Sequence, residues 1–208
     1  LDGLEVALGD RLILGLLLSR GDLRGYKRLL SLSGTLPTDF QAISGTGHTL
    51  TNMALMGILS TAYVLLLDGE LSGPVIGGIL TVVGFAAFGK HPRNALPVMA
   101  GVLLVNVVGI SPMNSPLALM GALFGTTLAP LAGRYGILAG VLAGALHMLL
   151  VGNVGFLHAG MNLYNNGFSG GFIAAALFPL LDTLRGMREA RNLQKKGKRK
   201  QTDGPEGA

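Results

Sequence analysis

The residues best suited to chemistry gather in one uncharged stretch, residues 158–171, which reads HAGMNLYNNGFSGG. Asn and Gly tolerate turns with positive φ, which bring backbone amides and carbonyls to one point, and a helix beginning near Phe168 would add its N-terminal amides. We predict that this turn binds a neutral solute or an ion through the side chains of His158, Asn162, Tyr164, Asn165 and Asn166. The alternative is a structural loop at a membrane interface, with Tyr164 among the interfacial aromatic residues.

A second histidine, His147, lies in the middle of an apolar stretch, on the helical face of Gly140 and Gly144. Imidazole titrates near pH ~6.5, which suits a proton relay. The simpler interpretation is a neutral His that is hydrogen-bonded to a neighbouring helix. Because a polar side chain in hydrocarbon needs a partner or a function, we add His147 to the predicted site as a buried partner of the turn.

A basic turn before an expected helix is the other polar cluster of the chain. Its polar members are Lys90, His91, Arg93 and Asn94. Pro92 suits the first position of a helix. Lys90 and Arg93 would then lie at the N-terminus of that helix, where they could bind an anion. The alternative is a cytoplasmic anchor that follows the positive-inside rule.

The sequence lacks the common signatures of catalysis. It contains no HExxH, no P-loop and no GxGxxG before a helix, and it has no cysteine. Asp182 is the only carboxylate within an apolar segment, so no carboxylate pair can share acid and base roles. We therefore expect no enzyme, no cofactor and no metal. A lipid-modifying enzyme, with His91 or His158 as general base, is the weaker alternative.

The composition excludes most soluble classes. Half of the 208 residues are hydrophobic, 13% are charged, and the mean hydropathy is +0.54. Residues 41–180 hold only five charged side chains, Asp68, Glu70, Lys90, Arg93 and Arg134. So few charges cannot give several helices a water-facing surface, which argues against a soluble enzyme and a disordered protein. Most of the basic excess lies in the C-terminal tail, where membrane topology explains it better than a nucleic-acid partner, which we do not expect.

The apolar residues form six segments of 17 to 22 residues, at 48–67, 72–89, 94–110, 116–132, 136–157 and 168–184. A helix needs roughly 20 residues to cross a bilayer core, so the shorter segments are candidates for half-helices or re-entrant pairs. We predict an all-α integral membrane protein with about six transmembrane segments. We expect residues 1–47 to form an amphipathic segment and a loop. We expect residues 48–184 to form the membrane domain, and residues 185–208 to form a basic, disordered cytoplasmic tail.

The connections between these segments alternate in charge. Basic residues precede the first segment, follow the second and fourth, and fill the tail, whereas the other connections are acidic or neutral. The positive-inside rule then puts both ends of the chain in the cytoplasm.

A weak internal repeat suggests how the segments are related. Residues 54–57 and 118–121 both read ALMG, and the apolar pattern is three segments in 48–110 and three in 116–184. An odd number of spans per copy inverts the second copy, an arrangement typical of transporters. We predict a transporter or channel for a small solute or ion. The alternative is a non-transporting scaffold or assembly subunit whose glycine-rich faces bind another subunit.

Two motifs resemble a known family. Residues 73–90, which include TVVGFAAFGK, and residues 162–168, NLYNNGF, resemble a bacterial family of multi-pass membrane proteins, domain of unknown function family 1576. The resemblance extends over most of residues 1–185. The resemblance implies a protein about twice this length with two related halves, of which this chain resembles the second. The resemblance implies a location in the inner (plasma) membrane of a bacterium and a homologous half or a second copy as partner. It supplies no catalytic or binding residue.

Overall fold

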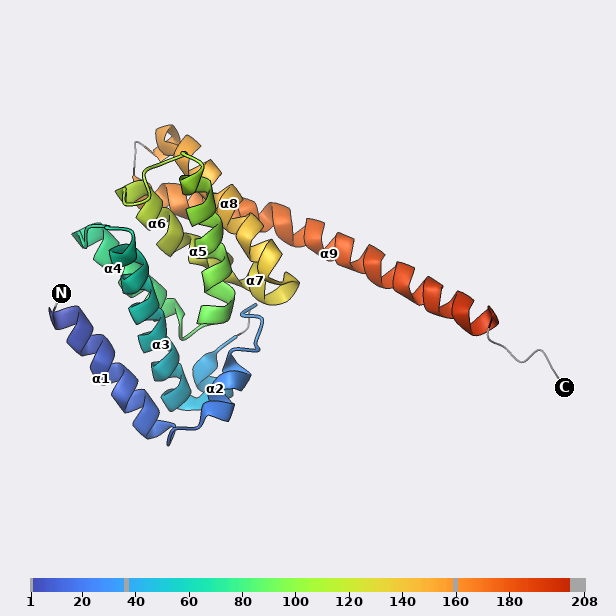
Figure 1. The fold of residues 1–208 in the computed structure, drawn as a ribbon, viewed down its shortest axis with the longest axis horizontal. Helices are drawn as coiled ribbons and strands as arrows, with labels where there is room; N and C mark the ends of the chain where they lie inside the picture. The colour runs from blue at the N-terminus through green and yellow to red at the C-terminus, as the bar shows by residue number, and fades with distance from the viewer. Residues whose placement is uncertain (1, 36–37, 159–160, 203–208) are drawn as a thin grey trace. The chain divides into compact units, whose positions relative to one another are not determined.

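The computed structural model describes residues 2–35, 38–158 and 161–202, except for the side chains of residues 2, 4, 5, 158 and 195–202. In these ranges all regular secondary structure is helical, as predicted (Figure 1). The elements are, in chain order, α1 (Asp2–Leu18), α2 (Leu23–Leu29), α3 (Phe40–Leu66), α4 (Gly73–Phe85), α5 (Pro92–Val107), α6 (Pro116–Gly125), the 3₁₀ turn η1 (Thr126–Leu128), α7 (Ala129–Tyr135), α8 (Ile137–Asn153), the 3₁₀ turn η2 (Gly155–His158) and α9 (Asn162–Thr202).

Three helical stretches are long and apolar enough to cross a membrane: Phe40–Leu66, Pro116–Tyr135 and Asn162–Gln194. Two further apolar helices, Gly73–Phe85 and Ile137–Asn153, are shorter. Helix α5 covers the third expected segment, so each of the six segments contains a helix. The long apolar helices identify the chain as a helical membrane protein by length and composition.

The chain divides into two units, Leu1–Ala174 and Ala175–Ala208. The first is a bundle of α1 to α8 with the beginning of α9. The second holds the rest of α9, with an ion pair of 3.0 Å between Arg185 Nε and Glu189 Oε1. We expected a disordered tail from residue 185, whereas the structure continues α9 as far as Thr202.

The N-terminal part is more helical than we expected. Residues 1–47 were predicted to hold an amphipathic segment and a loop, but the structure forms α1 and α2 there and begins α3 at Phe40. The carboxylate of Asp39 caps α3 by accepting two backbone N–H groups of its first turn. Helix α3 then bends at Gly45, whose φ of 80° suits glycine. The cap explains the early start, and the bend separates a short first turn from the long apolar part.

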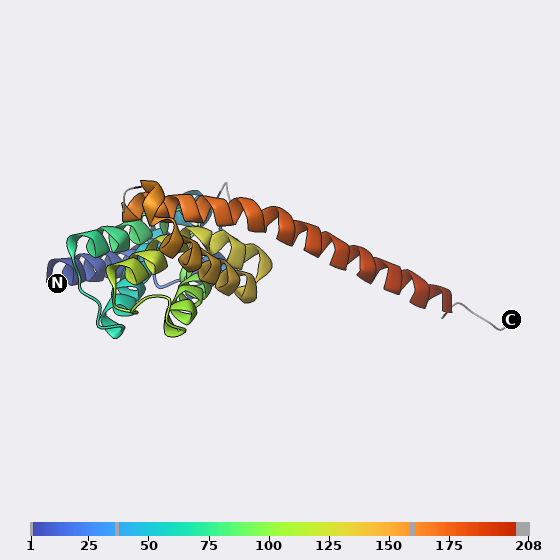
Figure 2. The same ribbon diagram turned by 90° about the horizontal axis from the view of Figure 1, so that it is seen from above.

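Glycines let helices of the bundle approach closely. Helix α1 lies along α3 (Figures 1 and 2), and a Cβ on Gly15 would lie 2.6 Å from the backbone N of Thr51. Helix α5 lies on α8, where a Cβ on Gly144 would collide with the carbonyl of Val98. Small residues at such contacts are how helices gain packing energy in lipid, so these glycines serve helix packing.

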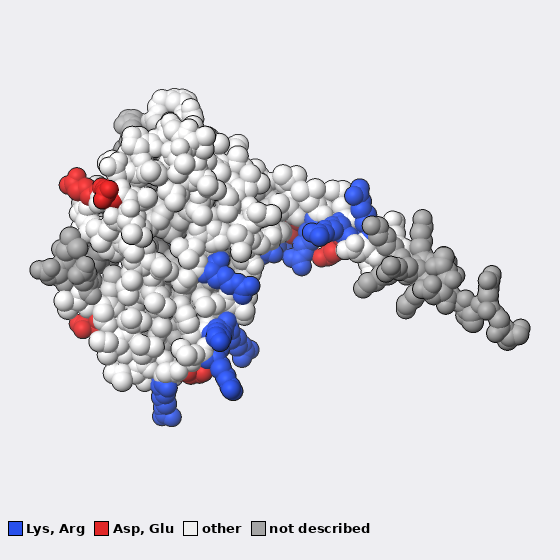
Figure 3. Space-filling model, viewed as in Figure 1, with Lys and Arg blue, Asp and Glu red and all other residues white. Residues whose placement is uncertain are grey.

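The charged side chains nearest to α3 in the sequence lie before its first residue and after its last. The basic residues Arg24, Lys27 and Arg28 lie in α2, just before α3, and the acidic residues Asp68 and Glu70 follow the last residue of α3. On the face drawn in Figure 3, charged atoms of the bundle lie near its edges and a broad uncharged area separates them. Basic residues therefore predominate in α2, before α3, and the acidic residues Asp68 and Glu70 follow α3.

Candidate functional site

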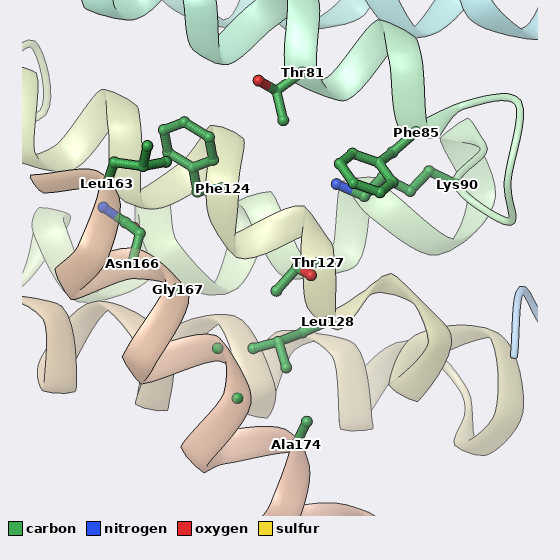
Figure 4. Close-up of a pocket in the computed structure, with 12 residues that line it drawn as sticks. Thr81, Phe85, Lys90, Phe124, Thr127, Leu128, Leu163, Asn166, Gly167 and Ala174 are labelled. Carbon is green, nitrogen blue, oxygen red and sulfur yellow. The ribbon is translucent and has the colours of Figure 1, made fainter. Parts of the chain in front are cut away.

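A pocket of about 320 Å³ opens inside the first unit, where the break between α4 and α5 meets α6, η1 and the beginning of α9 (Figure 4). Most of its wall is apolar, and it has a few polar members. The lining residues are Thr81, Phe85, Lys90, Phe124, Thr127, Leu128, Leu163, Asn166, Gly167, Gly170, Gly171 and Ala174. The pocket thus brings together Lys90 of the predicted basic turn and Asn166, the one member of the five predicted binding side chains of the Asn-rich turn that lines it.

Lys90 supplies the charge of this pocket. Its side chain is only 8% exposed, its Nζ donates to Thr126 Oγ1 at 2.9 Å, and Nζ lies 5.0 Å from the centre of the Phe85 ring. Among the described residues no carboxylate forms an ion pair with it. Burial disfavours the charged amine and lowers the pKa of Lys90 from 10.5 to about 8.

The connection that carries Lys90 is held by two buried amides. Asn52 of α3 donates through Nδ2 to the carbonyls of Ala86 and Lys90, at 2.7 Å each. Asn94 Nδ2 donates to the carbonyl of Gly89 at 2.8 Å, where a φ of 101° suits glycine. These bonds satisfy backbone carbonyls that have no helix partner, and they fix the place from which Lys90 enters the pocket.

Asn52 is a functional neighbour that we did not predict. Its side chain is fully buried, and its Oδ1 accepts a hydrogen bond of 3.2 Å from Tyr26 Oη. Burial raises the pKa of Tyr26 to about 12, so this phenol stays a hydrogen-bond donor. The signal available in the sequence was a lone Asn within the apolar segment 48–67.

The rest of the basic turn lies away from Lys90. His91, Arg93 and Asn94 line a separate pocket of about 170 Å³. His91 Nε2 lies 2.9 Å from the carbonyl of Leu32, and because a carbonyl only accepts, Nε2 carries the proton. Its Nδ1 has no hydrogen-bond partner among the described residues. Burial, with a smaller contribution from the charge of Arg93, lowers the pKa of His91, while the bond to Leu32 opposes the shift.

The predicted Asn-rich turn is mostly helical, which corrects our expectation. Helix α9 begins at Asn162 rather than near Phe168. Asn166 Nδ2 donates to the carbonyl and to Oδ1 of Asn162, at 2.8 Å each, one helical turn back. Such local bonds satisfy the Asn side chains within a helix and remove the need for a turn.

His147, which we predicted to be a buried partner of the Asn-rich turn, contacts Asn166 of α9. His147 Nε2 lies 3.1 Å from Asn166 Oδ1, and both side chains are buried. The amide oxygen accepts, so His147 Nε2 donates, and its Nδ1 has no partner among the described atoms. This bond joins α8 to the first turn of α9 beside the pocket.

The other predicted residues are placed less favourably. Asn165 is buried, and Asn162 bonds Asn166, but neither lines the pocket, and Tyr164 is 60% exposed. The side chain of His158 lies outside the described part of the chain. Within the described residues no group of three or more His, Asp or Glu could hold a metal ion. The arrangement is therefore suited to binding through Lys90.

A comparison with protein families covers the whole of this site. Residues 19–183 match the sequence model of the family described as "Protein of unknown function (DUF1576)". The chain belongs to the DUF1576 family. The DUF1576 match includes Lys90, Asn166 and every other residue that lines the pocket. No curated protein and no solved structure matches the chain.

Proposed function

We propose that this DUF1576 protein carries a small solute or ion across the membrane and that the solute binds in the pocket of Lys90 and Asn166. The observation that carries the proposal is the pocket itself, in which a buried cation, an amide and hydroxyl groups converge among apolar walls. Ligand sites of membrane transporters are built in this way, at helix ends inside the membrane domain.

The order of the helices supports a transport fold. In this proposal α3, α4 and α5 form the first copy of the repeat, residues 48–110, and α6 to α7, α8 and α9 form the second, residues 116–184. In this proposal all six segments are embedded and the second copy is inverted. The basic residues of α2, before α3, and the acidic residues after α3 support cytoplasmic ends for the chain.

Filling the pocket tests this function directly. Gly167 lines the pocket in α9, and a Cβ on it would meet no atom within 4 Å, so the Gly167→Leu side chain has room to occupy the space. We expect Gly167→Leu to lower the flux of a transported solute into liposomes at least tenfold. Uptake from a panel of labelled small solutes of graded charge is the measurement.

The matched control is Gly186→Leu, also in α9 and also without a neighbour within 4 Å of its Cβ, but outside the pocket. It changes helix propensity equally and should leave flux unchanged. Equal flux in both variants and the parent would contradict the proposal. Folded protein without flux for any solute, purified with a stoichiometric partner, would favour the scaffold alternative. Among the described residues that line the pocket, Lys90 alone is titratable, so no acid–base pair is present there, and we also propose that the protein is not an enzyme.

A further inference from the structure

The hydrogen-bonding capacity left in the pocket points to one class of ligand. Both donors of Asn166 are engaged by Asn162, and its oxygen accepts from His147. Thr81 Oγ1 donates to the carbonyl of Gly77 in its own helix. Lys90 differs, because its ammonium has three N–H donors and only one hydrogen bond, to Thr126, among the described residues. The Lys90 ammonium is therefore the strongest hydrogen-bond donor that this pocket offers to a ligand.

The charge of Lys90 has no counterpart in the pocket. Every other lining residue is neutral, and no described carboxylate pairs with Nζ. A buried charge without a partner is costly, and an anionic ligand would supply the missing partner. Thr127, which follows the Thr126 that Lys90 contacts, also lines the pocket.

The apolar residues of the wall indicate what the uncharged part of the ligand is like. Phe85, Phe124, Leu128 and Leu163 present apolar surface, and the volume of about 320 Å³ is small for a ligand pocket. A strongly hydrated inorganic ion would leave these walls unused. We propose that the pocket binds an organic monocarboxylate, with its carboxylate on the Lys90 ammonium and a small apolar body against the aromatic and leucine side chains. This inference rests on the proposed function, because it names the substrate class of the same pocket.

Direct binding of radiolabelled benzoate to the purified, detergent-solubilised chain tests the inference. Benzamide has the same size without the charge and serves as the competitor. We expect benzoate to bind the parent protein and benzamide to compete at least tenfold more weakly than unlabelled benzoate. Lys90→Met should weaken benzoate binding at least tenfold, and Lys90→Arg should restore part of it.

Arg93→Met is the matched control, because it removes an exposed cation three residues away that does not line this pocket. It should bind benzoate as the parent does. Equal binding by Lys90→Met, equal competition by benzamide, or no benzoate binding to folded protein at 10 mM would each overturn the inference. If decanoate displaces benzoate better than hexanoate does, the natural ligand is the carboxylate of a membrane lipid. If hexanoate displaces benzoate better, the natural ligand is a soluble metabolite.

A second measurement covers the case in which Lys90→Met does not fold. Benzoate stays ionised between pH 7 and pH 10, while the Lys90 ammonium loses its proton over part of this range. No other lining residue titrates there, so binding by the parent protein should decline as the pH rises. Binding that is constant up to pH 10 would overturn the inference.

The outcomes separate this inference from the transport proposal. Lys90-dependent benzoate binding without flux into liposomes would retain the carboxylate site and contradict transport. Flux of neutral solutes that Gly167→Leu blocks, without Lys90-dependent benzoate binding, would retain transport and overturn the carboxylate site.

Discussion

At the scale of single residues, Lys90 is the residue whose placement is hardest to explain by stability. Its pKa of about 8 in the folded protein lies below the ordinary value of 10.5, so unfolded protein binds more protons between these two pH values. The charged form therefore destabilises the folded state, fully below pH 8, and this cost disappears above about pH 10.5. A residue that costs stability in a pocket is a candidate for function.

This leads to a prediction about stability and pH. Lys90→Met should raise the melting temperature of the chain at pH 7 by about 2–4 °C, because an apolar side chain replaces a buried cation. The gain should shrink toward zero as the pH approaches 10.5, where the parent lysine is neutral as well. Circular dichroism at 222 nm measures both. A lower melting temperature for Lys90→Met at pH 7 would contradict the argument, and the exposed Arg93→Met should show no pH-dependent gain.

Asn52 carries a different prediction, because it stabilises the turn without lining the pocket. Asn52→Leu would leave the carbonyls of Ala86 and Lys90 buried without partners, at about 1–3 kcal/mol for each. We expect a clear loss in the free energy of unfolding and weaker benzoate binding. Asn153→Leu is the control, since the exposed Asn153 side chain bonds only the carbonyl of Leu149 in its own helix. Equal stability of the two variants would exclude the role assigned to Asn52.

The contact between His147 and Asn166 is open to a double-mutant cycle. Removing either partner leaves the other buried with an unmet hydrogen bond, so the single changes to Ala should not add. We expect a coupling of about 0.5–3 kcal/mol in the free energy of unfolding. Additive effects of His147→Ala and Asn166→Ala would show that this bond does not join α8 to α9 in the folded protein.

At the scale of helices, close packing of α5 on α8 depends on a missing side chain. Gly144→Ala would place a Cβ against the carbonyl of Val98, which is backbone and cannot move aside cheaply. We expect it to destabilise the protein by about 1–3 kcal/mol, as overpacking does. Gly77→Ala is the comparison, because Gly77 lies in α4 with no atom within 4 Å of a Cβ and Ala favours a helix over Gly. Thermal melts in which Gly77→Ala is the more harmful change would refute this packing.

At the scale of the whole molecule, topology is the feature to measure. The chain has no cysteine, so single cysteines can be labelled without a background. If the six segments span, then Glu70→Cys, Asn114→Cys and Phe156→Cys should react with an impermeant maleimide on intact cells. Ser31→Cys and Gly186→Cys should react only after permeabilisation. Protection of Phe156→Cys would show that α8, one of the shorter apolar helices, is re-entrant, and the inverted repeat would have to be redrawn.

The helices of the fold could be predicted from the sequence, whereas the residues at which they begin could not. The six apolar segments predict the helices from α3 to α9, because a helix that is buried in lipid requires a long run of apolar residues. Boundaries were less predictable. The helix start at Phe40 depends on the Asp39 cap, and the start at Asn162 depends on side-chain bonds that Asn residues make as readily in helices as in turns.

The sequence alone determined an all-helical membrane protein of the DUF1576 family and two polar clusters, because composition and local motifs carry that information. Tertiary structure alone decided which members of these clusters meet. It placed Lys90 and Asn166 in one pocket, moved His91 and Arg93 to another, and left Tyr164 exposed. The physical reason is that a lysine in a turn is solvated or buried according to what packs around it. Here Asn52 of α3, which is far from Lys90 in the sequence, hydrogen-bonds the turn from which the Lys90 side chain extends into the pocket.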